Sequence, residues 1–155
     1  MKKSAFWILM VACLMAFGCS HSSKNAALVE HTFHNTVWER FDYVYNVVEL
    51  KEPTTFDIDM RISFTDDYPF DYFEMVFTIL DSHGDRYRAK GYKFNLKDND
   101  GAWKSPLKDG CHTFGFPINK ELSISEPGKY RFQIEYRMPK TPLVGVKEIV
   151  LNNNH

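Results

Sequence analysis

Apolar and polar residues alternate along two nine-residue stretches of the chain. In residues 56–64 (FDIDMRISF) every even position is apolar and every odd position is polar, and residues 130–138 (YRFQIEYRM) repeat this alternation. Side chains of a β-strand point alternately to its two faces, so a period of two predicts a strand with one buried and one solvated face. Two such strands indicate an antiparallel sheet that packs on one side.

Further apolar stretches, separated by turn residues, predict more strands. We expect these at residues 72–80, 86–96, 111–116 and 143–151, with one or two others within 32–48. Within 86–96 the parity of the apolar positions switches at Gly91, which predicts a β-bulge there. Pro117 is expected to end the strand that starts at Cys111, and residues 97–110 to form a long loop around Trp103.

Seven or eight short strands and no helical periodicity predict an all-β domain over residues 30–155. We expect an antiparallel immunoglobulin-like β-sandwich, with a small barrel or jelly roll as the alternative. The whole chain has 13 Phe, 8 Tyr and 3 Trp, of which only Phe6, Trp7 and Phe17 precede this domain. A domain of this length therefore has ample apolar material for one core.

The first residues have the layout of a lipoprotein signal peptide. Lys2 and Lys3 precede thirteen uncharged apolar residues at positions 5–17, a stretch too short to span a bilayer, which takes about 20 residues. Gly18 and Cys19 then complete a lipobox-like site. We predict a signal peptide over 1–18 and a lipidated Cys19 that opens a flexible tether over 19–29. The alternative is an ordinary secreted protein cut elsewhere.

A lipid anchor on Cys19 would place the domain close to a membrane. Stable anchoring takes more than one acyl chain, palmitate among the candidates. The residue after Cys19 is Ser20, whereas an aspartate there retains lipoproteins in the inner membrane of well-studied systems. We therefore expect an outer-membrane anchor with the domain facing the periplasm.

Charge and cysteine content exclude some classes of protein. Removal of residues 1–18 takes away two lysines and leaves 17 basic against 20 acidic side chains, a net charge near −3. No basic block indicates nucleic-acid binding. Cys13 lies in the signal peptide and Cys19 is the lipidation site, so Cys111 has no partner for an internal disulfide. We expect Cys111 to be a buried, unreactive thiol.

The stretch 72–80 (YFEMVFTIL) is apolar on both faces of its predicted strand. One face carries Phe73, Met75, Phe77 and Ile79, and the other carries Tyr72, Glu74, Val76, Thr78 and Leu80. The second face is either covered by a loop, such as the one with Trp103, or exposed as a contact surface. The candidate partner-binding residues are therefore Tyr72, Glu74, Val76, Thr78 and Trp103.

Three groups of polar residues are candidates for a metal-binding or catalytic site. His31 and His34 would point to opposite faces of a strand, which disfavours a shared metal ion. The sequence Asp98-Asn99-Asp100-Gly101 lacks the flanking acids of a calcium loop and favours a simple turn. Asp57 and Asp59 occupy the solvated face of a strand, so paired-carboxylate catalysis is disfavoured. We expect no metal, no cofactor, no catalytic residues and no enzymatic activity.

Three segments resemble the gliding-motility lipoprotein GldH family. Residues 68–73 (YPFDYF) resemble that family's Tyr-Pro-aromatic turn entering a strand, and residues 127–138 (PGKYRFQIEYRM) and 143–146 (LVGV) follow in the same order. The chain looks like a divergent member from Trp38 to its end. The resemblance implies an envelope lipoprotein required by a multi-protein surface-motility apparatus that is coupled to protein secretion, without enzymatic activity.

Two functional hypotheses follow from these observations. The first is a non-enzymatic scaffold or interaction subunit that contacts other envelope proteins of the motility and secretion apparatus. The second is a glycan-binding β-sandwich lipoprotein, because aromatic side chains on a sandwich provide a stacking platform. The second hypothesis requires Trp38, Trp103 and neighbouring tyrosines to lie exposed on one concave face.

Overall fold

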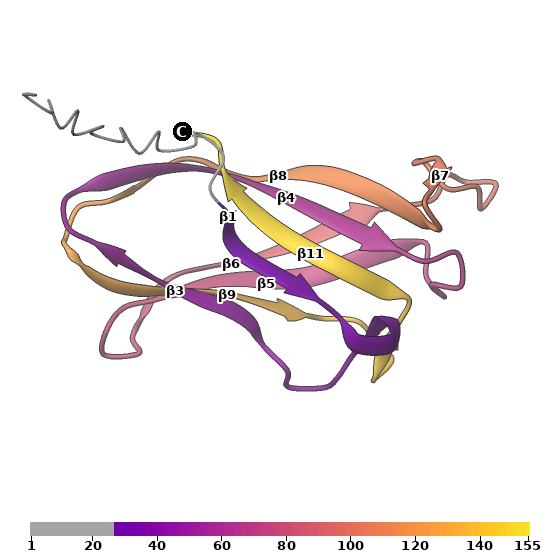
Figure 1. Cartoon of the computed structure of the whole chain (residues 1–155), viewed down its shortest axis with the longest axis horizontal. Coiled ribbons are helices and arrows are strands. Elements are labelled where there is room, and N and C mark those ends of the chain that lie inside the picture. The colour runs from indigo at the N-terminus through magenta and orange to yellow at the C-terminus, as the bar shows by residue number, and fades with distance from the viewer. Residues whose placement is uncertain (1–26) are drawn as a thin grey trace, which may run out of the picture.

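The computed structural model describes residues 27–155, which fold into two packed β-sheets (Figure 1). Eight strands have six or more residues: β1 (Ala27–Thr32), β3 (Val44–Leu50), β4 (Thr54–Phe64), β5 (Tyr72–Leu80), β6 (Arg86–Asn95), β8 (Cys111–Ile124), β9 (Gly128–Tyr136) and β11 (Val146–Asn153). Short elements are β2 (Val37–Trp38), β7 (Leu107–Lys108), β10 (Leu143–Val144) and the 3-10 turn η1 (His34–Thr36). The predicted all-β antiparallel sandwich is confirmed.

Each sheet is antiparallel throughout. The first has the strand order β1-β11-β4-β8-β7 and the second has the order β3-β9-β5-β6, while β2 and β10 form a small separate ribbon. We call these the first sheet and the second sheet. Among the long strands only β5 and β6 are consecutive neighbours in one sheet, so most connections cross from one layer to the other. Figure 1 shows the two layers stacked, with the strands of each running roughly alongside the other.

The alternation in the sequence produces the core between the sheets. In β4 the even positions from Phe56 to Phe64 are at most 3% exposed. In β5 the odd positions from Phe73 to Ile79 are at most 1% exposed, and β9 contributes Tyr130, Phe132 and Ile134 to the same cluster. Burial of a large apolar side chain contributes about 1.5–3 kcal/mol, so these rows supply the main driving force for folding.

The two long seams of the sandwich differ. On one side the edge strands β1 and β3 lie together, and the Asn46 amide donates a 2.9 Å hydrogen bond to the Leu28 carbonyl across the sheets. On the other side β6 faces β8 through side chains, including a stack of Phe94 on Phe116 with ring centroids 4.1 Å apart. The hydroxyl of Tyr92 also donates to the carbonyl of Ile118. The backbone edge of β6 is therefore open.

The bulge predicted at Gly91 is wrong in position. Gly91 pairs with Val76 in a regular ladder, and the register shift lies where Ile79 and Leu80 meet Arg88 and Arg86. Tyr87 is the extra residue of this bulge, and it turns inward to donate a hydrogen bond to the Ser123 carbonyl. The sequence pattern correctly indicates that β6 contains a bulge, but the extra residue is Tyr87 and not Gly91.

Pro117 does not end its strand, which corrects the prediction of a strand over 111–116. β8 continues to Ile124, and Pro117 lies opposite Asp59 beside two register shifts against β4. A proline lacks an N–H and is tolerated at such irregular positions. Pro117 therefore marks an irregularity in the pairing of β4 with β8 and not the end of β8.

The expected last strand, 143–151, is divided at Gly145 into β10 and β11. Gly145 has φ +84°, and a Cβ there would lie 2.7 Å from the Cα of Tyr68. Its amide donates to Thr36 and its carbonyl accepts from Thr65. This contact joins two segments that resemble the GldH family, 68–73 and 143–146.

Two other boundaries differ from expectation. The strand expected over 130–138 ends at Tyr136, although the amide of Arg137 still donates to the Glu74 carbonyl. β1 begins at Ala27, within the segment expected to be tether. The predicted signal peptide and Cys19 lie outside the described residues. Within residues 27–155, no helix is long and apolar enough to cross a membrane.

We predict that Gly145→Ala strongly destabilises the domain. The new methyl group overlaps the Tyr68 backbone at a positive φ, so the free energy of unfolding should fall by about 3 kcal/mol in a urea titration. Gly84→Ala is the matched control, because Gly84 has φ +83° and open space around its Cβ position, and it should cost about 1 kcal/mol. Equal losses for the two variants would contradict a role for the Tyr68 contact.

Candidate interaction surface

The outer face of the second sheet carries two exposed large apolar side chains, Tyr45 and Val47, and the outward residues of β5. Outward residues of β5 are each half-buried by their neighbours on the strands beside them, namely Tyr72, Glu74, Val76, Thr78 and Leu80. The structure thus confirms that these residues share one face. No element among residues 27–155 packs over this face as a further layer. We call it the outer face.

A hollow lies in the outer face at Gly91. It has a volume of about 320 Å³ and is lined by residues of β5, β6 and the segment after β9. The space above Gly91 is open: a Cβ at this position would have no atom within 4 Å. A glycine inside a strand often marks the close approach of another group. The hollow is therefore a place where a side chain of a partner can insert.

Charged and aromatic side chains border this hollow. The Lys93 ammonium lies 2.9 Å from the Glu74 carboxylate and 4.1 Å from the centre of the Tyr72 ring. The hydrogen bond to Glu74 raises the pKa of Lys93 above its ordinary value. The Lys93 ammonium group therefore links Glu74 and Tyr72 at the border of the hollow.

The β3 side of the outer face presents larger exposed groups. Tyr45 is 53% exposed and Val47 is 51% exposed, an unusual degree for large apolar residues of a strand. The guanidinium of Arg131 lies 3.7 Å from the centre of the Tyr45 ring, and its Nε has no hydrogen-bond partner among the described residues. An arginine stacked on a tyrosine is a group enriched at protein interfaces.

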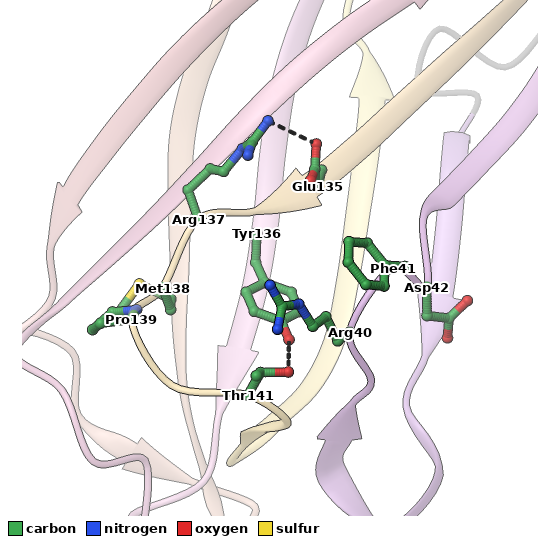
Figure 2. Close-up of a pocket in the computed structure, with 9 residues that line it drawn as sticks. All are labelled: Arg40, Phe41, Asp42, Glu135, Tyr136, Arg137, Met138, Pro139 and Thr141. Atoms are coloured by element: carbon green, nitrogen blue, oxygen red, sulfur yellow. Dashed lines mark hydrogen bonds and ion pairs between the residues drawn. The ribbon is translucent and has the colours of Figure 1, made fainter.

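A cleft adjoins the end of the outer face, between the loop 39–43 and the segment after β9. It encloses about 290 Å³ and is lined by Arg40, Phe41, Asp42, Glu135, Tyr136, Arg137, Met138, Pro139 and Thr141 (Figure 2). Phe41 is 69% exposed and has φ +64°, and the guanidinium of Arg40 lies 4.9 Å from its ring centre. The loop therefore holds an aromatic side chain in solvent at the mouth of the cleft.

Buried groups fix the walls of this cleft. The indole of Trp38 donates a 2.6 Å hydrogen bond to the Asp42 carbonyl, which ties the exposed loop to the core. The ring of Tyr136 packs edge-on against Trp38, with centroids 5.2 Å apart, and its hydroxyl donates to Thr141. Figure 2 also shows the ion pair between Arg137 and Glu135, 3.1 Å apart.

Arg137 lines both the cleft and the Gly91 hollow. Its backbone amide is anchored on Glu74, and its guanidinium pairs with Glu135 on the outer face. The cleft and the outer face are thus parts of one continuous surface. The sequence did not point to Arg40, Phe41 and Arg137, because only the fold brings the loop 39–43 beside residues 135–141 and Arg137 beside β5.

Trp103 does not belong to this surface, although it was predicted as a candidate contact residue or as a cover for β5. Its ring lies near those of Phe64, Tyr68 and Phe114 at the end of the core. Tyr68, one of these neighbours of Trp103, is itself buried, and this burial raises the pKa of its hydroxyl far above the ordinary value. The Tyr68 hydroxyl donates a hydrogen bond to the Tyr72 carbonyl. The Trp103 ring therefore packs at one end of the core, and its role in partner contact stays a prediction.

His112 is a buried polar residue that the sequence did not single out. Its ring stacks on Trp103, with centroids 4.2 Å apart and an interplanar angle of 10°. One ring nitrogen lies 2.7 Å from the Ser105 carbonyl and the other lies 3.2 Å from a carboxylate oxygen of Asp66. Both partners are hydrogen-bond acceptors, and a neutral imidazole ring has a single N–H, so it donates to one of them at a time. These contacts place His112 between the loop 97–110 and the residues that follow β4.

The acidic residues that were candidates for chemistry accept hydrogen bonds from other groups of the chain. The carboxylate of Asp57 accepts from the Glu121 amide, and that of Asp59 accepts from the Asn154 side chain. Asp98 accepts from two backbone amides of the turn that follows it, which confirms the predicted turn. Cys111 is buried as predicted, with 5% exposure. Within residues 27–155 no three potential metal ligands gather.

The sequence profile of the GldH lipoprotein family matches residues 28–152 of the chain. No curated protein matches the chain. Among solved structures, the crystal structure of dimeric latent PorU from Porphyromonas gingivalis is similar to 85% of this chain, with 12% identity and a TM-score of 0.32. The chain spans 11% of the length of that PorU chain, and a likeness this distant carries no functional argument.

We predict that Trp103 contributes to stability rather than to partner contact. Trp103→Ala should lower the free energy of unfolding by about 3 kcal/mol, because it leaves a cavity beside Phe64 and unstacks His112. Val47→Ala, on the exposed outer face, should cost less than about 1 kcal/mol in the same urea titration. A Trp103→Ala variant with an unchanged unfolding transition would contradict this assignment.

Proposed function

The chain belongs to the GldH lipoprotein family, and from this membership we propose that it is a non-enzymatic interaction subunit of an envelope motility apparatus. In this proposal the outer face and its adjoining cleft bind another envelope protein. Membership in a lipoprotein family implies a lipid-anchored, envelope-associated protein. Cys19 as the acylated residue, palmitate in the anchor, the outer membrane and a periplasmic domain remain parts of the proposal.

The exposed outer face is the observation that carries the proposal. In this two-layer sandwich one face of each sheet is buried, and the outer face of the second sheet exposes Tyr45 and Val47 and leaves Val76 half-buried. The apolar groups of this face lie on β3 and β5, on either side of the polar outward row of β9. A mixed surface with exposed tyrosine and stacked arginine is typical of protein contact sites. The hollow at Gly91 and the cleft at Phe41 add the concave relief that anchors a partner's side chains.

The glycan-binding hypothesis has less support. It requires Trp38 and Trp103 to lie exposed on one concave face, whereas Trp38 is fully buried and Trp103 is stacked on His112. The exposed rings of Phe41 and Tyr45 lie against the guanidinium groups of Arg40 and Arg131 rather than in a row of aromatic rings. Protein binding is therefore the function that this surface favours.

The proposal is tested by crosslinking in living cells, followed by purification of the tagged protein and mass spectrometry. We expect other motility or secretion proteins of the envelope to be recovered with the unaltered chain. The double variant Val76→Lys, Thr78→Lys places two charges in the middle of the outer face and should reduce this recovery by at least about tenfold.

The matched control is Gly115→Lys, Ser123→Lys, which adds the same charges to the outer side of the first sheet. Both positions are exposed, and a Cβ at Gly115 meets no atom within 4 Å. This control should keep normal recovery. Equal recovery for the two double variants, or recovery of polysaccharide alone, would remove the support for protein binding at the outer face.

Cys19→Ala should release the protein from the membrane. The thiol of Cys19 is the proposed site of the thioether and hence of the acyl chains, without which the protein has no anchor. Immunoblotting of fractionated cells should find the variant in the soluble fraction. Retention of the variant in the membrane fraction, at the level of the unaltered chain, would refute the proposed anchor.

A further inference from the structure

The strand β6 forms the open edge of the second sheet, and it differs from the other edges of the sandwich. β3, the opposite edge, lies against β1, whereas β6 pairs with β5 alone among the described strands. An unpaired edge presents a row of free N–H and C=O groups that is ready to pair with another strand. The edge of β6 is ten residues long, from Arg86 to Asn95.

The pairing pattern identifies the backbone groups that face outward. The Leu96 amide donates to the Asp71 carbonyl at 2.8 Å, in line with the ladder between β5 and β6. Backbone groups of an antiparallel strand point alternately to its two sides. The groups of Phe94, Tyr92 and Lys90 therefore pair with β5, and those of Asn95, Lys93, Gly91 and Ala89 face the open edge.

This edge is strongly basic. β6 carries Arg86, Arg88, Lys90 and Lys93 and no acidic residue. Lys93 is paired with Glu74, but the other three have no carboxylate within 4 Å among residues 27–155. Like charges on the same strand of a second copy would repel, so self-association through this edge is disfavoured. The charges instead complement an acidic chain.

We propose that the open edge of β6 binds an extended acidic segment of a partner protein as an added antiparallel strand. The inference rests on the proposed function and names the chemistry of the partner's segment. Main-chain hydrogen bonds to the edge would supply affinity, and alternate side chains would supply specificity. The antiparallel direction continues the pattern of every other pair in the sheet.

The side chains of β6 define which sequence would fit. On the side that faces β8, basic Arg88 and Lys90 are followed by aromatic Tyr92 and Phe94, which are half-buried. An antiparallel partner strand would place two apolar residues and then two acidic residues at alternate positions against this row. On the other side the small residues Ala89 and Gly91 leave room for the partner's remaining side chains.

The test measures binding of the detergent-solubilised lipoprotein to a labelled peptide, Thr-Val-Thr-Ile-Thr-Glu-Ser-Glu-Ser, by fluorescence anisotropy. Its glutamates lie opposite Lys90 and Arg88 in the antiparallel register. We expect saturable binding that slows hydrogen exchange at the outward amides of Ala89, Gly91 and Lys93. A peptide N-methylated at its third, fifth and seventh residues, whose amides would face β6, should not bind, because it cannot form the ladder.

The double variant Arg88→Glu, Lys90→Glu should weaken peptide binding by at least about tenfold. A peptide with lysine in place of both glutamates should bind this variant better than it binds the unaltered chain. The matched control Lys108→Glu, Lys147→Glu makes the same charge change at exposed positions of the first sheet and should bind normally. These four side chains are all exposed, so the variants should fold.

Equal affinity for the two double variants, or exchange protection outside β6, would overturn the inference. Binding to phosphatidylglycerol vesicles that depends on Arg88 and Lys90, without peptide binding, would also overturn it and assign the edge to lipid headgroups. These results would leave co-purification through Val76 and Thr78 unchanged. Failure of that co-purification with intact peptide binding would instead reject the outer face.

Discussion

The structure depends on the packing of one row of apolar side chains from each sheet against the row of the other. Phe56 on β4 meets Phe132 on β9 with ring centroids 5.4 Å apart, and Phe64 meets Phe73 at 5.7 Å. This layer is only one side chain deep per sheet, so it uses half of the positions in each strand. The other half of the positions is free of any packing requirement and is available for contact with other molecules.

The two outer faces use that freedom differently. On the first sheet, polar side chains bind the chain itself: Asp57 and Asp59 hold backbone and side-chain amides of Glu121 and Asn154, and Arg61 pairs with Glu148. The second sheet also has ion pairs on its outer face, between Lys93 and Glu74 and between Arg137 and Glu135. It differs in that the side chains of Tyr45 and Val47 remain about half exposed. The basic edge of β6 extends the same surface. The first sheet has a hollow of its own, of about 600 Å³, lined by residues such as Ser105, Lys108 and Lys147. The exposed side chains of Tyr45 and Val47 and the basic edge of β6 are the features that favour the second sheet in our proposal.

Local sequence patterns predicted the features that nearby residues determine, such as which face of a strand is buried. They did not predict the features that depend on residues distant in the sequence, such as bulges and contacts between strands. The alternation in 56–64 and 130–138 predicted which residues of β4 and β9 are buried, and the two-sided character of 72–80 marked the outer face. Gly91 and Pro117 were misread because a bulge is set by the opposing strand, here at Tyr87 and near Asp59. The stacking of His112 on Trp103 and the position of Arg137 beside β5 depend on the fold and have no signal in the sequence.

The central claim is that partners bind the second sheet and not the first. Gly91 and Gly115 allow the most direct test, because each lies on a strand, has an ordinary φ and has open space at its Cβ position. A photocrosslinking amino acid at either position should leave the fold intact. The account predicts that irradiated cells yield specific protein adducts from position 91 and none from position 115. Adducts from position 115 alone, or equal adducts from both, would contradict it.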